Sequence, residues 1–236
     1  MINNALIDIY KGYQGQKPEL AKIFFLGNDA NFSEKFVSHE GKEFLKNHIE
    51  PYLKDGVSYW KTKRAHHPFV HSDYPFDKRI DGVPYHSNFR KIYSDNSSLT
   101  EKLPDLVSFI EIIPYPTIGN VSDKERKEAF ISNEKGEIQH VDKLFTSLMN
   151  RTDNILIFIP KKVLDALKYL KNDLKLKSLI EIPAKLFDCE SFEEFCLGKN
   201  RNIRIIKSTH FSATIKDEIK IGKPREIISD FLKKNL

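Results

Sequence analysis

Cysteine and long apolar runs are scarce in this chain of 236 residues. Its two cysteines, Cys189 and Cys196, are too few for a disulfide framework and lack the spacing of a zinc site. No segment approaches the roughly 20 apolar residues of a membrane-spanning helix. The first residues also lack the basic and apolar regions of a signal peptide. We therefore expect a cytoplasmic protein with reduced thiols and no membrane association.

Internal repeats, low-complexity tracts and flexible linkers are also absent from the sequence. With 40% apolar and 30% charged residues, the composition is typical of a globular protein, and we assign residues 1–236 to a single domain. The net charge of +5 is a mild basic excess, which permits a polyanionic partner such as DNA without requiring one. We expect a monomer.

Short apolar runs alternate with segments of helical period along the chain. The apolar runs predict strands at 21–27, 106–114, 154–159 and 203–209, with an edge strand at 180–183. The helical spacing predicts helices at 3–13, 32–53 (with a weak point at Gly41), 121–132, 136–150, 161–170 and 224–234. Residues 54–91 read as one long irregular stretch. This alternation predicts the α/β class, with three α/β/α layers around a short, mainly parallel central sheet.

Two polar segments directly follow predicted strands. The first is Gly27-Asn28-Asp29-Ala30-Asn31-Phe32, and the second is His210-Phe211-Ser212. Because parallel strands deliver their carboxyl ends to one edge of a sheet, Asp29 and His210 are expected to face each other there. Each segment has an ordinary alternative, which is an Asx turn at Asp29 and a solvated histidine at 210.

Taken together, the two segments resemble the signature motifs of the uracil-DNA glycosylase superfamily, which read Gly-Gln-Asp-Pro-Tyr-His and His-Pro-Ser. The order and separation of the motifs agree, and the resemblance covers residues 21–214. The chain departs from the pattern at Ala30, Asn31 and Phe211, which replace proline, tyrosine and proline, so it resembles a divergent member. The resemblance implies a short parallel sheet between helical layers, with the active site at the strand ends.

The resemblance also implies roles for the motif residues in breaking the bond between a sugar C1′ and a base. Asp29 occupies the position of a carboxylate that stabilises the cationic sugar and orients water. His210 occupies that of a histidine that stabilises the departing base. Backbone amides of both motifs are expected to hold flanking phosphates, assisted by the Ser212 hydroxyl. The expected substrate contacts in the motifs are Gly27, Asn28, Asn31, Phe32 and Ser212.

Base selection falls to Glu111, because the strand at 106–114 aligns with the superfamily strand that carries the base-reading residue. That residue is often an asparagine, which favours uracil. An ionised carboxylate only accepts hydrogen bonds, so it suits the N4 amino group of cytosine and repels the O4 atom of uracil. We therefore expect a modified, cytosine-type base, and defence against phage DNA is one setting for such an enzyme. In an alternative of equal weight, Glu111 caps a helix or pairs with an arginine.

Residues 54–91 mix aromatic, basic and histidine side chains. The resemblance implies that this region lines the base pocket and that one aromatic residue stacks on the flipped base. The candidates for stacking are Tyr59, Trp60, Phe69 and Tyr85. His66 and His67 join Tyr85 as expected substrate contacts. The histidine spacing matches no standard metal site, and two cysteines cannot hold the iron–sulfur cluster that some superfamily members carry, so we expect no metal or other cofactor.

Phe211 is the candidate for a wedge that fills the gap left by a flipped base, although packing beneath the loop is the commoner fate of a phenylalanine. Neither motif contains a lysine, so no Schiff-base lyase step is expected. The predicted function is therefore that of a monofunctional DNA glycosylase, which leaves an abasic site. The alternatives are excision of uracil or hypoxanthine, hydrolysis of free nucleosides, and a DNA-binding module of the same fold without catalysis.

Overall fold

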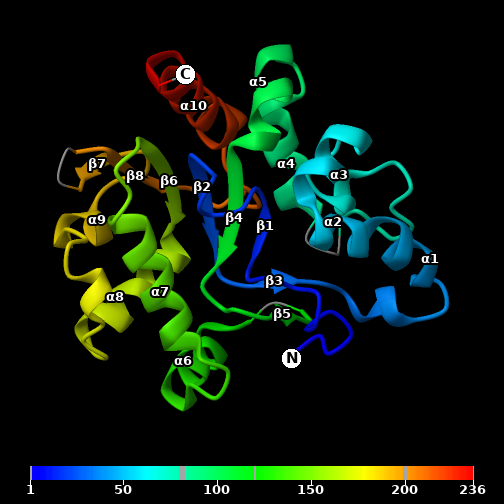
Figure 1. The fold of residues 1–236 in the computed structure, drawn as a ribbon, viewed down its shortest axis with the longest axis horizontal. Helices are drawn as coiled ribbons and strands as arrows, with labels where there is room; N and C mark the ends of the chain where they lie inside the picture. Colours follow the sequence, from blue (N-terminus) through cyan, green and yellow to red (C-terminus); the bar gives the residue numbers. More distant parts are fainter. Residues whose placement is uncertain (1, 80–82, 120, 199–200, 236) are drawn as a thin grey trace.

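A mixed six-stranded sheet forms the centre of the protein in a computed structural model that describes residues 2–79, 83–119, 121–198 and 201–235 (Figure 1). The strand order is β1-β4-β2-β6-β8-β7. The strands are β1 (Tyr13–Gly15), β2 (Ile23–Gly27), β4 (Val107–Glu111), β6 (Ile155–Pro160), β7 (Glu194–Leu197) and β8 (Ile203–Ser208). The inner four strands are parallel, and β1 and β7 are antiparallel edge strands. The predicted α/β class with a mainly parallel sheet is therefore confirmed.

The four parallel strands end at one edge of the sheet. Gly27 at the end of β2 pairs with Glu111 at the end of β4, and Pro160 at the end of β6 pairs with Ser208 at the end of β8. Every residue of β4 and β6 is buried, as expected for parallel strands covered on both faces. The polar residues that follow these strands therefore gather at the carboxyl edge.

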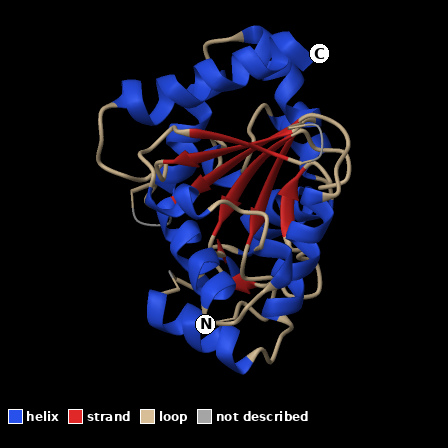
Figure 2. Ribbon diagram, turned by 90° about the vertical axis from the view of Figure 1, so that its left-hand side faces the viewer, coloured by secondary structure: helices blue, strands red, loops and turns tan. Residues whose placement is uncertain are grey.

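Helices cover both faces of the sheet, which lies between them in Figure 2. On the first face, Phe24 and Ile157 pack among the apolar side chains of four helices and one 3₁₀ turn. These elements are α6 (Asp123–Ser132), α7 (Glu137–Met149), α8 (Lys161–Asn172), η5 (Lys177–Leu179) and α9 (Ala184–Asp188). The start of α6 is defined by a capping box, in which Ser122 and Glu125 bond each other's backbone N–H groups.

On the second face, Phe25 and Phe158 stack in parallel with their ring centroids 4.8 Å apart, within an aromatic core that includes Trp60 and Phe89. The elements of this layer are α3 (Gly56–Lys63), α4 (Val83–Tyr93), α5 (Ser97–Lys102), η4 (Leu103–Asp105), η6 (Glu218–Gly222) and α10 (Lys223–Asn235). The aromatic residues of this layer fill the space between the helices and the sheet.

A third apolar cluster, centred on Phe36, Phe44 and Tyr52, lies beside the carboxyl edge. It is built from η1 (Glu34–Val37), α1 (Lys42–Phe44), η2 (Leu45–Ile49), α2 (Glu50–Lys54) and η3 (Pro68–Val70). A small parallel sheet of β3 (Ala30–Asn31) and β5 (Pro116–Thr117) continues the chain beyond the ends of β2 and β4 (Figure 1). This cluster and small sheet support the loop that carries Asp29.

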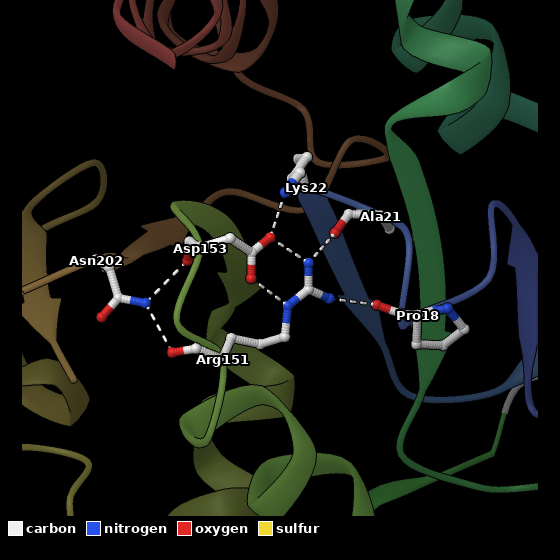
Figure 3. Close-up of polar contacts among 6 residues, drawn as sticks. All are labelled: Pro18, Ala21, Lys22, Arg151, Asp153 and Asn202. Carbon is white, nitrogen blue, oxygen red and sulfur yellow. Dashed lines mark hydrogen bonds and ion pairs between the residues drawn. The ribbon is translucent and has the colours of Figure 1, made fainter. Parts of the chain in front are cut away.

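The opposite, amino edge of the sheet is held by a polar network centred on Arg151 and Asp153 (Figure 3). The Arg151 guanidinium donates to the carbonyl oxygens of Pro18 and Ala21 at 2.7 and 3.0 Å, and it pairs with the Asp153 carboxylate. Lys22 adds a second ion pair to Asp153. These partners hold the pKa of Asp153 well below its ordinary value, chiefly through its hydrogen bond from Arg151. The network joins the starts of β2 and β6.

Several predicted elements differ from the structure. Residues 3–13 form isolated turns instead of a helix, because the Asn3 N–H bonds the Pro116 carbonyl at 2.8 Å and Gly12 turns the chain at φ +76°. The segment 54–91, predicted to be irregular, contains α3 and α4, whose polar residues interrupt the apolar spacing that identifies a helix. Residues 80–82 of this segment lie outside the described residues. The range 180–183 contains no strand, and the edge strand is β7.

The predicted helix at 32–53 divides near Gly41. A Cβ atom at Gly41 would lie 2.0 Å from the Lys35 carbonyl oxygen, so the close approach of η1 to the following helix requires glycine there. The remaining predicted helices correspond to α6, α7, α8 and α10. Within the described ranges, no helix combines the length and apolar character needed to cross a membrane.

Candidate active site

A cavity of about 600 Å³ opens at the carboxyl edge of the parallel sheet. Ten of the twelve residues predicted from the sequence line it. They are Gly27, Asn28, Asp29, Asn31, Phe32, His67, Tyr85, Glu111, His210 and Ser212. The remaining two, His66 and Phe211, do not line the cavity. The structure thus brings the ends of β2, β4 and β8 together with the segment 54–91, and the roles assigned to these residues stay predictions.

Asp29 lies directly beyond β2, where its carboxylate is held by two donors. The Thr117 hydroxyl donates to Asp29 Oδ2 at 2.6 Å, and the backbone N–H of Val121 also donates to the carboxylate. Burial raises the pKa of Asp29, and these hydrogen bonds offset part of that rise. Arg126 and Lys162 act in the same direction as the hydrogen bonds, through their positive charge. The result is an oriented carboxylate with increased basicity.

Glu111 at the end of β4 is buried against Gly27. A Cβ atom at position 27 would lie 1.8 Å from Glu111 Oε2, so glycine at the end of β2 makes room for the carboxyl group. Oε2 is buried without a hydrogen-bond partner. Neither of the expected alternatives, a helix cap or an arginine pair, is seen for this carboxyl group in the described part of the chain.

Burial, and next the nearby charge of Asp29, raise the pKa of Glu111 to about 8. The side chain is therefore neutral at pH 7, and it offers one O–H donor and one carbonyl acceptor. This corrects the sequence-based expectation of an ionised Glu111 that only accepts hydrogen bonds. The argument that it repels the O4 atom of uracil does not hold for the neutral acid.

His210 lies at the mouth of the cavity, immediately after β8. Its Nδ1 atom accepts from the backbone N–H of Ser212 at 3.3 Å and lies 2.5 Å from the Ser212 hydroxyl oxygen. Because Nδ1 is the acceptor, the proton of the neutral ring resides on Nε2. Desolvation lowers the pKa of His210, with help from the positive charge of Lys162, even though the residue is exposed at the surface. The ring is therefore a neutral N–H donor at pH 7.

Phe211 is part of the second core layer and is not presented to solvent. Its side chain is 3% exposed and packs 5.7 Å from the Phe25 ring and 5.5 Å from the Phe89 ring, centroid to centroid. The Asn88 amide donates to its carbonyl oxygen at 2.7 Å. The wedge role predicted for Phe211 is therefore wrong for this arrangement, and the residue instead anchors the loop that carries His210.

A chain of hydrogen bonds lies behind one cavity wall. Tyr93 Oη lies 2.9 Å from His66 Nδ1 and also accepts from the His66 backbone N–H, so its own proton is available to Nδ1. His66 Nε2–H then donates to His86 Nδ1 at 3.2 Å, which leaves the proton of the neutral His86 ring on Nε2. His66 is fully buried, so its predicted contact with substrate is wrong. It contacts His86 instead, and His86 lines the cavity.

His67 forms the neighbouring part of this wall. Its ring stacks on that of His86 at a centroid distance of 3.8 Å, and its Nε2–H donates to Gln14 Oε1 at 3.0 Å. Burial lowers the pKa of His67 well below its ordinary value and that of His86 to about 3. Both rings are therefore neutral at physiological pH. This uncharged pair meets the Phe69 ring edge-on, and Phe69 also lines the cavity.

Sequence reasoning missed several residues that line the cavity. Lys161 and Lys162 begin α8 at the end of β6, and the rule that placed Asp29 at a strand end also applies to them. His86 and Gln14, which line the cavity, carry no comparable signal, because their positions depend on contacts between distant segments. The same holds for Thr117, which does not line the cavity but bonds Asp29. Among the described residues, the grouping that could hold a metal ion is His48, His71 and Asp73, and it lies outside this cavity.

Comparisons with protein-family models, with curated proteins and with solved structures found no match to this chain.

Proposed function

We propose that this protein is a monofunctional DNA glycosylase that hydrolyses the N-glycosidic bond of a flipped-out, modified base of cytosine type. The observation that carries the proposal is the pairing, in one cavity, of an oriented carboxylate at Asp29 with a neutral imidazole N–H donor at His210. Cleavage of this bond leaves positive charge on the sugar and negative charge on the base. The reaction therefore needs a negatively charged group beside the sugar and a hydrogen-bond donor beside the base.

Asp29 serves the sugar side of the reaction. Its carboxylate stabilises the oxocarbenium-like sugar and orients a water molecule for attack on C1′. The raised pKa makes the carboxylate a stronger base for the proton of that water. The Thr117 hydroxyl holds one carboxylate oxygen in place, which reduces the rearrangement needed during the reaction.

His210 serves the base side. A neutral Nε2–H group donates a hydrogen bond to the oxygen of the departing base, where negative charge accumulates. Lys162 lowers the pKa of His210 and adds positive charge near the same place. Lys161 and Lys162 also line the cavity, where they suit the phosphates on either side of the flipped nucleotide.

The base-reading step rests on Glu111. A neutral carboxyl group forms two hydrogen bonds with cytosine, because its O–H donates to N3 and its carbonyl accepts from the N4 amino group. The same group also pairs with uracil, through O–H to O4 and from N3–H to the carbonyl, so the base-release assay decides between the two bases. The cavity volume of about 600 Å³ is in the range of small-molecule sites and is large enough for a flipped nucleotide that carries a modified base. Tyr85 and Phe69 contribute the aromatic surface on which a base stacks.

The test is a base-release assay. Duplex and single-stranded oligonucleotides carrying uracil, hypoxanthine, 5-hydroxymethylcytosine or glucosylated cytosine are incubated with the protein, and abasic sites are then cleaved with alkali. We expect cleavage of a cytosine-derived substrate, at least 100-fold loss of rate in Asp29→Asn with DNA binding retained, and normal rates in the exposed control Asp165→Asn. Release of base from free nucleosides but not from DNA would contradict the proposal. Retained DNA binding with no cleavage of any substrate would instead favour the binding module.

The pH profile separates the two carboxyl groups. Catalysis requires Asp29 to be ionised, so kcat/KM rises with pH through the raised pKa of Asp29. Base reading requires Glu111 to be neutral, so kcat/KM falls above pH 8. We expect Glu111→Gln to remove the alkaline fall while the acid limb stays. An unchanged alkaline limb in this variant would exclude Glu111 as the base reader without bearing on Asp29.

A further inference from the structure

A cluster of three potential metal ligands lies outside the cavity, where η2 meets the chain that follows η3. Oδ2 of Asp73 is 3.5 Å from Nε2 of His48 and 3.7 Å from Nδ1 of His71, and one ligand atom from each residue lies within 4.8 Å of the others. The two imidazole rings are 4.3 Å apart, centroid to centroid. We propose that His48, His71 and Asp73 bind a divalent transition-metal ion of the zinc class.

The distances from Asp73 Oδ2 to the two histidine nitrogens are slightly longer than the distances between neighbouring ligand atoms around a bound zinc ion. Zinc binds imidazole nitrogen and carboxylate oxygen at about 2.0–2.2 Å in tetrahedral geometry, which places neighbouring ligand atoms about 3.4 Å apart. The distances from Asp73 Oδ2 therefore need shifts of only a few tenths of an ångström. Two imidazoles and one carboxylate favour zinc, cobalt or nickel over magnesium or calcium, which prefer sites made of oxygen alone.

Each of two ligands is oriented by a further hydrogen bond. Tyr59 Oη lies 2.9 Å from His48 Nδ1, so Nδ1–H has an acceptor and Nε2 is directed toward Asp73. The Ser72 hydroxyl donates to Asp73 Oδ1 at 3.0 Å, which leaves Oδ2 to face the two rings. Partners of this kind fix the ring orientation and the tautomer of a metal ligand.

Two features of the site weaken the binding of a metal ion. His71 Nδ1 accepts a 3.2 Å hydrogen bond from the Asp73 backbone N–H, which the metal would replace. Lys63, Lys78 and Arg90 also place positive charge near His71. The side chain of Asp73 is 65% exposed, so an ion can enter from solvent and complete its coordination with water.

The proposed ion would join two segments that are distant in sequence. His48 belongs to η2, and His71 and Asp73 follow η3, which carries the cavity residue Phe69. Binding would therefore hold the aromatic wall of the cavity in place. Sequence spacing did not reveal this site, because 22 residues separate the two histidines and only the fold brings them together. The proposal is independent of the function assigned to the cavity.

The test is a zinc titration of the full-length protein after treatment with EDTA, followed by calorimetry. We expect one equivalent of Zn²⁺ to bind, a rise in Tm with added zinc, and a visible absorption band when Co²⁺ replaces Zn²⁺. Asp73→Asn should abolish binding, and Tyr59→Phe, which keeps the ring, should weaken it about 10- to 100-fold.

Matched controls come from exposed residues of the same types. Asp77→Asn and His39→Gln should bind zinc as the unaltered protein does. The proposal would be overturned if Asp73→Asn bound zinc as tightly as the unaltered protein does. It would also be overturned if His39→Gln lost as much zinc affinity as Asp73→Asn. The absence of any saturable binding would overturn it as well. Because Asp73 is mostly exposed, Asp73→Asn is expected to fold, and its circular dichroism spectrum checks this.

Discussion

Replacing Glu111 with glutamine should change how the stability of the protein depends on pH. The native state holds the proton of this buried carboxyl up to a pKa of about 8, whereas the ordinary value of 4.5 applies to the unfolded chain. Between these values the unfolded chain binds fewer protons than the native state. The contribution of Glu111 to the free energy of unfolding therefore falls as the pH rises from 4.5 to 8.

The magnitude follows from the two pKa values. Each tenfold difference in proton affinity corresponds to about 1.36 kcal/mol. At pH 7, keeping Glu111 neutral costs the native state about 3 kcal/mol, and above pH 8 the cost approaches about 5 kcal/mol. Near pH 4 the cost is close to zero, because the carboxyl is then mostly protonated in both states. The variant Glu111→Gln has no such titration.

The assay is urea unfolding of the unaltered protein and of Glu111→Gln at pH 5 and at pH 8. We expect the free energy of unfolding of the variant, relative to the unaltered protein, to increase by about 3 kcal/mol between the two pH values. Taking this difference cancels the fixed cost of burying an amide. Glu101→Gln, on an exposed position of α5, controls for the exchange of a glutamate for a glutamine at a site that is not buried. Parallel pH dependences in the unaltered protein and in Glu111→Gln would refute a neutral Glu111.

Three further predictions test other parts of the structure. Gly27→Ala should displace the Glu111 carboxyl and lower kcat/KM for base release about tenfold or more, because the added Cβ atom would lie 1.8 Å from Glu111 Oε2. An unchanged kcat/KM would contradict this. Asp153→Asn should lower the free energy of unfolding by about 1.5–3 kcal/mol at pH 7, because Arg151 loses its charged partner. Since the pKa of Asp153 is lowered in the native state, this loss should shrink as the pH falls below 3.8, and denaturant titrations across that range measure it. Tyr93→Phe should allow the hydrogen bonds between His66 and His86 to reverse direction, so that ¹⁵N NMR detects both neutral tautomers of these rings. A single unchanged tautomer would show that the Tyr93 hydroxyl does not set the tautomer.

The sequence alone was enough to predict the parallel sheet and ten of the residues that line the cavity. The apolar runs of β2, β4, β6 and β8 are long enough to identify the strands, and the polar residues after them mark their carboxyl ends. Parallel strands end at one edge, so Asp29 and His210 were placed in a common site before any contact was known. The helices α3 and α4 were missed because aromatic and polar residues surround them on most sides, without a simple apolar stripe.

Only the tertiary structure decided the chemical state of the site and the fate of individual side chains. Glu111 is neutral because residues far apart in the chain remove it from water, and the proton of His86 is placed on Nε2 because Tyr93 and His66 orient the hydrogen bonds to Nδ1. Phe211 packs in the core instead of being exposed to solvent because Phe25 and Phe89 meet it there. Strand formation depends on neighbouring residues in the sequence, whereas desolvation, tautomers and packing depend on which distant segments the fold brings into contact.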